Sequence, residues 1–250
     1  MNSIYSKISF RAAEVALGVG LATVGMFLVS GVASAATVTS LPNLTDDDFD
    51  GLIDSGEFTE VFVAEGRVGN NSLNTAEREL GINDKAGNPV KSAQFEWGNG
   101  IEYDFTLNYD GSMVNYNVGG TLLSSQAFSD PIDTIYIRTK SVVNGNTSSS
   151  FSKVEGKSFN NLPLSFSSVA QDGGVNYLRI SDISESFELK GTVSFSWTGD
   201  QPTRSNLAYQ IQVGNSEPVP EPLTILGSGV ALGFGAFLKK ESSRKQNKVK

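Results

Sequence analysis

The sequence predicts an all-β protein, an antiparallel two-sheet β-sandwich of jelly-roll-like topology with about nine to eleven strands. Three observations favour this fold. Apolar and polar residues alternate through much of residues 59–213, turn-rich segments such as VNGNTSSS (143–150) and QDGGVN (171–176) interrupt the alternation, and no long stretch keeps a helical period. At 250 residues, of which 39% are hydrophobic, the chain is long enough for one such domain and additional terminal segments.

The clearest predicted strands lie at residues 95–97, 101–109 and 114–118. Asp110-Gly111 is typical of a two-residue hairpin turn between the last two. That turn would pair Leu107 with Val114, Phe105 with Tyr116 and Tyr103 with Val118, all apolar with apolar. A three-residue loop at 98–100 would place Phe95 opposite Tyr103 and Trp97 opposite Ile101, and Tyr109 continues the apolar face.

Further alternation predicts strands at residues 135–137, 175–180, 187–197 and 207–213. EVFVA at residues 60–64 reads as another strand. Residues 74–80 fit a helix of about two turns or less, or a strand, so this segment stays open. The core-facing residues expected in the later strands are Ile135, Ile137, Phe187, Leu189, Val193, Phe195, Trp197, Leu207, Tyr209, Ile211 and Val213.

Histidine and cysteine are absent from the whole sequence. This absence excludes a Ser-His-Asp triad, a thiol nucleophile and a zinc site built from histidine or cysteine. Catalysis would therefore require carboxylates, serine with lysine, tyrosine, or a metal with oxygen ligands. No disulfide bond can stabilise the fold.

The first 35 residues have the organisation of a secretory signal peptide. Lys7 and Arg11 precede an apolar run at residues 15–29, and Ala33-Ser34-Ala35 follows it. Signal peptidase requires small residues before its cleavage site, so Ala33 and Ala35 predict export and cleavage after Ala35. An uncleaved N-terminal membrane anchor is the alternative interpretation.

A second apolar segment lies near the C-terminus. As a transmembrane helix, residues 223–238 would be roughly 24 Å long and would only marginally cross the roughly 30 Å of hydrocarbon in a membrane. Six lysines and arginines follow within residues 239–250 and mark the cytoplasmic side of such a span.

A short proline-rich motif, Val219-Pro220-Glu221-Pro222, directly precedes this span. Motif, span and basic tail together resemble the bacterial PEP-CTERM sorting signal, and the resemblance covers residues 219–250 only. It implies that an exosortase-type transpeptidase recognises the motif outside the membrane, removes the tail and passes the protein to the cell surface or extracellular matrix. An ordinary tail anchor is the alternative interpretation.

Between the two terminal signals we expect an acidic segment at 36–58, the sandwich at 59–213 and a short stalk at 214–218. Residues 36–218 carry 11 lysines and arginines against 24 aspartates and glutamates, a net charge of about −13. This charge argues against a nucleic-acid partner and favours solubility or cation binding.

The acidic segment contains DDDFDGLIDSGE at residues 46–57, which matches D-x-[DN]-x-[DN]-G-x5-E at every specified position. It resembles the loop of an EF-hand without the flanking helices, which implies a structural Ca²⁺ site. A solvated acidic linker is the alternative interpretation. The expected ligands are the carboxylates of Asp46, Asp48, Asp50, Asp54 and Glu57 and the backbone carbonyl of Leu52.

These observations favour an exported, non-catalytic protein of the cell surface or matrix, and two alternatives stay open. The predicted register places Glu96 opposite Glu102, and glycoside hydrolases use such pairs of carboxylates. The polar side chains of the same face favour instead a carbohydrate-binding module that contacts extracellular polysaccharide. No stacking aromatic is expected on this face, and a sugar site without one is usually weak. The polar side chains of the face are Thr106, Asn108, Asn115 and Asn117.

Overall fold

The computed structural model describes residues 36–69, 79–143, 146–183, 186–202 and 207–216. Within these ranges the chain forms thirteen β-strands, most with alternating burial, and one helix. The all-β class is confirmed, with more strands than expected. The strands are β1 (Thr37–Leu41), β2 (Phe58–Val68), β3 (Leu80–Asp84), β4 (Pro89–Ala93), β5 (Glu102–Tyr109), β6 (Val114–Val118), β7 (Thr121–Ser125), β8 (Thr134–Lys140), β9 (Thr147–Phe159), β10 (Leu162–Gln171), β11 (Val175–Ser181), β12 (Phe187–Gly199) and β13 (Leu207–Ser216). The helix, α1 (Asp46–Asp54), lies between β1 and β2.

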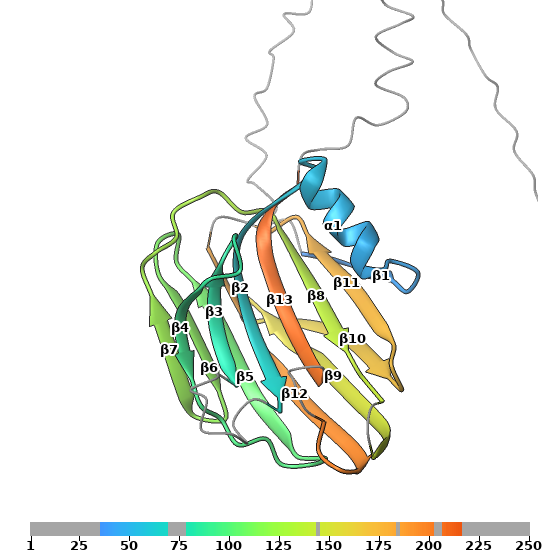
Figure 1. Ribbon diagram of the computed structural model, residues 1–250. Helices are drawn as coiled ribbons and strands as arrows, with labels where there is room; N and C mark the ends of the chain where they lie inside the picture. The colour runs from blue at the N-terminus through green and yellow to red at the C-terminus, as the bar shows by residue number, and fades with distance from the viewer. Residues whose placement is uncertain (1–35, 70–78, 144–145, 184–185, 203–206, 217–250) are drawn as a thin grey trace, which may run out of the picture. The chain divides into compact units, whose positions relative to one another are not determined.

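The strands form two antiparallel sheets that pack face to face, which confirms the predicted sandwich (Figure 1). Sheet A has the order β1-β11-β8-β13-β2-β3-β4, and sheet B has the order β10-β9-β12-β5-β6-β7. Eight strands pair in a nested way along the chain: β2 with β13, β5 with β12, β8 with β11 and β9 with β10. Segments that are far apart in sequence are therefore neighbours in both sheets.

The core lies between the sheets and is built from alternate residues of each strand. The residues predicted to face the core in β8, β12 and β13 are buried there, except that Trp197 at the end of β12 is only partly buried. At the centre, the hydroxyl groups of Tyr116 in sheet B and Tyr209 in sheet A join through a hydrogen bond. These two buried oxygen atoms therefore have partners inside the apolar core.

The hairpin between β5 and β6 forms as predicted, but its turn is longer. Tyr109 pairs with Val114 and Leu107 with Tyr116, so the connection comprises residues 110–113 instead of two residues. The Asp110 carboxylate accepts hydrogen bonds from the backbone N–H groups of Ser112 and Met113 and stabilises this wider turn. The register is shifted by two residues, and the core-facing side chains keep their face because strands have a period of two.

The predicted hairpin around residues 98–100 is wrong. β4 belongs to sheet A and β5 to sheet B, so residues 94–101 cross from one sheet to the other. Asn99 bonds to the backbone N–H and carbonyl of Trp197 at the end of β12. Phe95 and Trp97 nevertheless contact Tyr103 through their rings, with centroid separations of 5.0 and 5.5 Å.

The long hairpin of β9 and β10 is absent from the sequence prediction, which assigned residues 143–150 to a loop. Buried serines hide the strand pattern, since Ser150, Ser152 and Ser168 occupy core-facing positions. The two strands are joined by Asn160-Asn161, both with positive φ, as a type I′ turn requires. That dipeptide was the available signal for the hairpin.

The two ends of the folded unit fall close to the predicted processing sites. β1 pairs with β11 at the edge of sheet A, so residues directly after Ala35 belong to the sandwich. The predicted signal peptide, the sorting motif and the span at 223–238 lie outside the described residues. Within the described ranges, the structure has no helix that is long and apolar enough to span a membrane.

Candidate functional site

The predicted calcium loop is a helix in the structure. Thr45 caps α1: its hydroxyl accepts from the Asp48 N–H at 3.1 Å, and the Asp48 carboxylate accepts from the Thr45 N–H at 3.1 Å. This reciprocal capping box favours helix from Asp46 onward, and three aspartates in the first turn stabilise its N-terminus. The structure thus has a helix where the motif predicts a loop.

The expected calcium ligands do not converge in this conformation. Successive helical residues are rotated by about 100°, so Asp46 and Asp50 share a face whereas Asp48 points away. Asp48 is used by the cap, and the Leu52 carbonyl accepts a hydrogen bond from the Ser55 hydroxyl at 3.2 Å. Within the described ranges, no three acidic side chains lie close enough together to hold a metal ion. These residues, as placed, do not fit Ca²⁺, and calcium binding stays a prediction.

Asp46 instead fastens α1 to sheet A. Its carboxylate accepts hydrogen bonds from Arg138 Nε at 2.8 Å and Tyr177 Oη at 2.9 Å, and Lys140 Nζ lies 3.6 Å away. The hydrogen bond from Arg138, opposed by partial burial, lowers the pKa of Asp46 to about 2. The first residue of the acidic motif therefore has a structural partner far away in the sequence.

A small aromatic cluster completes the attachment of the helix. Phe49 is buried on the sheet-facing side of α1 and stacks on Tyr177 with a centroid distance of 5.2 Å. Phe58 and Tyr136 close the cluster at 5.7 and 5.1 Å from the Phe49 ring. Tyr136 alternates with core residues of β8, so this cluster lies on the outer face of sheet A, where Figure 1 shows the helix at one end.

Polar side chains continue from Arg138 across the outer face of sheet A. Arg138 Nη1 donates to Gln210 Oε1 at 3.1 Å, and Gln210 Nε2 donates to Glu65 Oε2 at 3.3 Å. Glu65 is buried and also forms an ion pair with Arg67. Burial raises the pKa of the nearby Glu60 to about 7, and the charges of Glu65 and Asp84 contribute to this shift.

The carboxylate pair expected for a glycoside hydrolase is not formed by strand pairing. Glu102 pairs with Ser194 of β12, and Glu96 lies in the crossing segment before β5. Both side chains are exposed. The polar face itself is as predicted, because Thr106, Asn108, Asn115 and Asn117 alternate with buried residues on β5 and β6.

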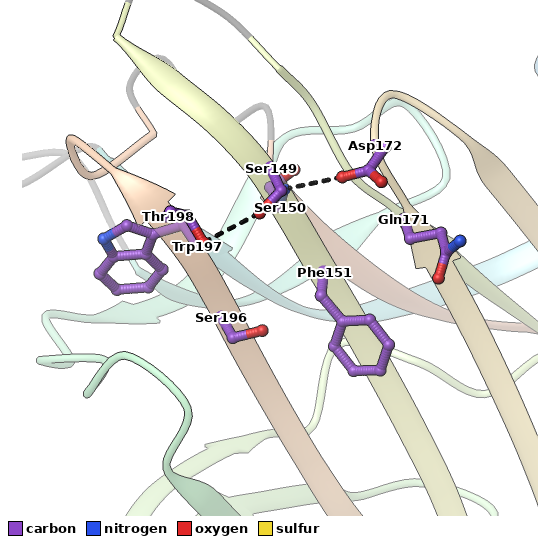
Figure 2. A pocket seen from close by; sticks show the side chains of 8 residues that line it. All are labelled: Ser149, Ser150, Phe151, Gln171, Asp172, Ser196, Trp197 and Thr198. Atoms are coloured by element: carbon purple, nitrogen blue, oxygen red, sulfur yellow. Dashed lines mark hydrogen bonds between the residues drawn. The ribbon is translucent and has the colours of Figure 1, made fainter.

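An aromatic side chain that the sequence analysis missed lies on this outer face of sheet B. Phe151 alternates with the buried Ser150 and Ser152 and therefore points away from the core. Its cross-strand neighbours are Gln171 in β10 and Ser196 in β12. Figure 2 shows the phenyl ring between these two polar side chains.

A shallow depression of about 260 Å³ surrounds Phe151. Ser149 Oγ donates to Thr198 Oγ1 at 3.0 Å on one side, and Asp172 Oδ1 accepts from the Ser150 N–H at 3.2 Å on the other (Figure 2). Its lining residues are Ser149, Ser150, Phe151, Gln171, Asp172, Ser196, Trp197 and Thr198. An apolar ring within a rim of hydroxyl, amide and carboxylate groups suits an uncharged polar ligand.

Comparison with known proteins adds no relative, since no family model and no curated protein matches the chain.

Proposed function

We propose that this chain is an exported, non-catalytic protein of the cell surface or extracellular matrix, delivered by its PEP-CTERM-like tail. One observation carries the proposal. The folded unit fills the interval between the two expected cleavage sites, since β1 begins at Thr37, just after Ala35, and β13 ends at Ser216, just before Val219. Removal of both terminal signals would leave every described strand intact.

The acidity and the packing of the domain support this role. A net charge of about −13 on residues 36–218 favours solubility outside the cell and disfavours nucleic acid. The non-catalytic part of the proposal is supported by the positions of Glu96 and Glu102. Glu102 pairs with Ser194, so the two glutamates are not cross-strand neighbours as a glycoside hydrolase pair was expected to be. We also infer a jelly roll, which the nested pairing of eight strands supports.

Processing of the full chain tests the proposal. The chain would be expressed in a bacterium that has an exosortase and in a strain from which the exosortase is deleted. We expect a mature N-terminus at Ala36 in both strains, and loss of residues 223–250 with release to the surface only when the exosortase is present.

Substitutions separate motif recognition from general effects. Pro220→Ala with Pro222→Ala should retain the tail, whereas Glu217→Ala, just outside the motif, should be processed normally. Retention of the chain in the cytoplasm, or loss of the tail independent of both exosortase and motif, would refute the proposal.

A further inference from the structure

Phe151 is a large apolar residue at a position outside the hydrophobic core. It lies on the outer face of sheet B, belongs to neither hydrophobic cluster of the described residues, and is partly exposed. Along the same face of β9, the next outward residues are Lys153 and Glu155, which pair with each other at 2.6 Å. The phenyl ring is thus a partly exposed apolar surface that is followed along β9 by charged residues.

Hydrogen-bonding groups with open capacity flank this ring. Neither the Ser196 hydroxyl nor the Gln171 amide makes a side-chain hydrogen bond to another described residue, and Gln171 is exposed. A serine hydroxyl and a glutamine amide both donate and accept, as vicinal hydroxyl groups of a ligand require. Asp172 uses Oδ1 for the Ser150 N–H, which leaves Oδ2 as a further acceptor on the rim.

The charges around the depression select an uncharged ligand. Asp172 is the single charged residue of its lining, and the exported segment is strongly acidic, so an anionic polymer would be repelled. No cationic side chain lines the depression to offset that repulsion. A neutral sugar has an apolar C–H face for the ring and hydroxyl edges for Gln171, Ser196 and Thr198.

We infer that the Phe151 depression binds a neutral polysaccharide, with one sugar ring stacked on Phe151 and its hydroxyl groups bonded to Gln171 and Ser196. The inference rests on the proposed export, because it requires contact with polymers outside the cell. At about 260 Å³ the depression is smaller than ordinary enclosed ligand pockets, which hold about 300–1,000 Å³. We therefore expect weak binding per site, with a Kd of about 1 mM, and an open surface along which a long chain can continue.

Affinity electrophoresis of purified residues 36–218 tests the inference. This segment contains every described strand and both core clusters, so it is the folding unit. The gels would contain starch, mixed-linkage β-glucan, galactomannan or xylan, with carboxymethyl cellulose as the anionic comparison. We expect at least one neutral polymer to retard the protein and carboxymethyl cellulose to leave its mobility unchanged.

Three variants locate the binding. Phe151→Ala should weaken the retardation about tenfold or more, and Phe151→Tyr should retain it because the stacking surface remains. Leu162→Ala is the matched control, since Leu162 is 58% exposed in β10 outside the depression. If Phe151→Ala shows altered circular dichroism, the double variant Gln171→Ala, Ser196→Ala takes its place.

The outcomes are separable from those for sorting, because binding is measured on the purified domain. Lack of retardation by all neutral polymers would overturn the inference even if the tail is processed. Equal retardation of the wild type and Phe151→Ala would overturn it as well. Retardation that is lost in Phe151→Ala and in the Gln171→Ala, Ser196→Ala variant but kept in Phe151→Tyr and Leu162→Ala, together with quenching of tryptophan fluorescence by the same polymer, would support it.

Discussion

Glu60 should make the stability of the domain depend on pH between about pH 4.5 and 7. Glu60 lies near the start of β2, and burial together with the charges of Glu65 and Asp84 raises its pKa from 4.5 to about 7. The folded state therefore retains a proton that the unfolded state releases at lower pH. Stability is full below the unfolded pKa and falls as pH rises toward the folded pKa.

The magnitude follows from the two pKa values. A difference of about 2.5 corresponds to about 3 kcal/mol, and because Glu60 retains some contact with water we expect a loss of about 2 kcal/mol. Glu60→Gln keeps the shape of the side chain and removes the titration. Relative to the wild type, the variant should gain about 2 kcal/mol on going from about pH 5 to about pH 8.

Urea unfolding of residues 36–218 at these two pH values measures the effect. Glu57→Gln, at an exposed site just before β2, is the matched control for the loss of one carboxylate. Taking the difference between variant and wild type cancels the other titrating groups. Identical pH profiles for Glu60→Gln and the wild type would refute the reasoning that burial of this carboxylate destabilises the fold.

Three further predictions concern α1 and the core. Asp46→Asn should destabilise the domain by about 1 kcal/mol at neutral pH, the low value reflecting the partial exposure of this carboxylate. Because the pKa of Asp46 is lowered, the difference should vanish in urea titrations as pH falls to about 2. The thermal midpoint of residues 36–218 in millimolar Ca²⁺ and in chelator distinguishes the helix from the predicted calcium loop. Equal midpoints would favour the helix, and a calcium-dependent rise that Asp46→Ala, Glu57→Ala abolishes would show that the segment leaves the helical state and binds the ion. Gly191→Ala should cost about 2 kcal/mol or more in urea unfolding, since its Cβ would lie 1.9 Å from the Glu155 carbonyl oxygen. Gly51→Ala in α1, whose Cβ would meet nothing within 4 Å, should instead stabilise by about 0.5 kcal/mol, and equal effects at the two sites would contradict this reading of the core.

Alternation in the sequence predicted the faces of the strands better than their neighbours. The β5–β6 hairpin kept each core-facing residue although its register differed by two positions, because only an odd slip exchanges the faces. The Asp110 carboxylate accepts hydrogen bonds from the backbone N–H groups of Ser112 and Met113, so these two residues join Asp110-Gly111 in the turn. Register therefore depended on side-chain bonding that a turn dipeptide does not reveal.

The acidic motif shows how one pattern serves two conformations. Asp48 is three residues after Thr45, which suits a capping box as well as a calcium loop. The choice also involves Arg138 and Tyr177, which hold Asp46 across the fold. Such long-range partners have no local signature in the sequence, so the helix could not be derived from residues 46–57 alone.

The candidate ligand site was hidden for a related reason. Serines at core positions of β9 and β10 removed the apolar alternation that identified other strands, and Phe151 was consequently placed in no strand. Those serines are accommodated by specific bonds, such as Ser152 Oγ to the Ala208 carbonyl at 2.9 Å and Ser168 Oγ to Thr139 Oγ1 at 3.1 Å. Polar residues satisfied by distant partners conceal strand periodicity.

The central position of β13 determines how the protein would respond to mechanical tension. This last strand runs between β2 and β8 in the middle of sheet A, and its final residues pair with the first residues of β2. A molecule tethered through its C-terminus and pulled from the opposite end of sheet A would be loaded along the axis of β13. Hydrogen bonds on both sides of the strand would then have to shear together, whereas an edge strand would peel away one bond at a time.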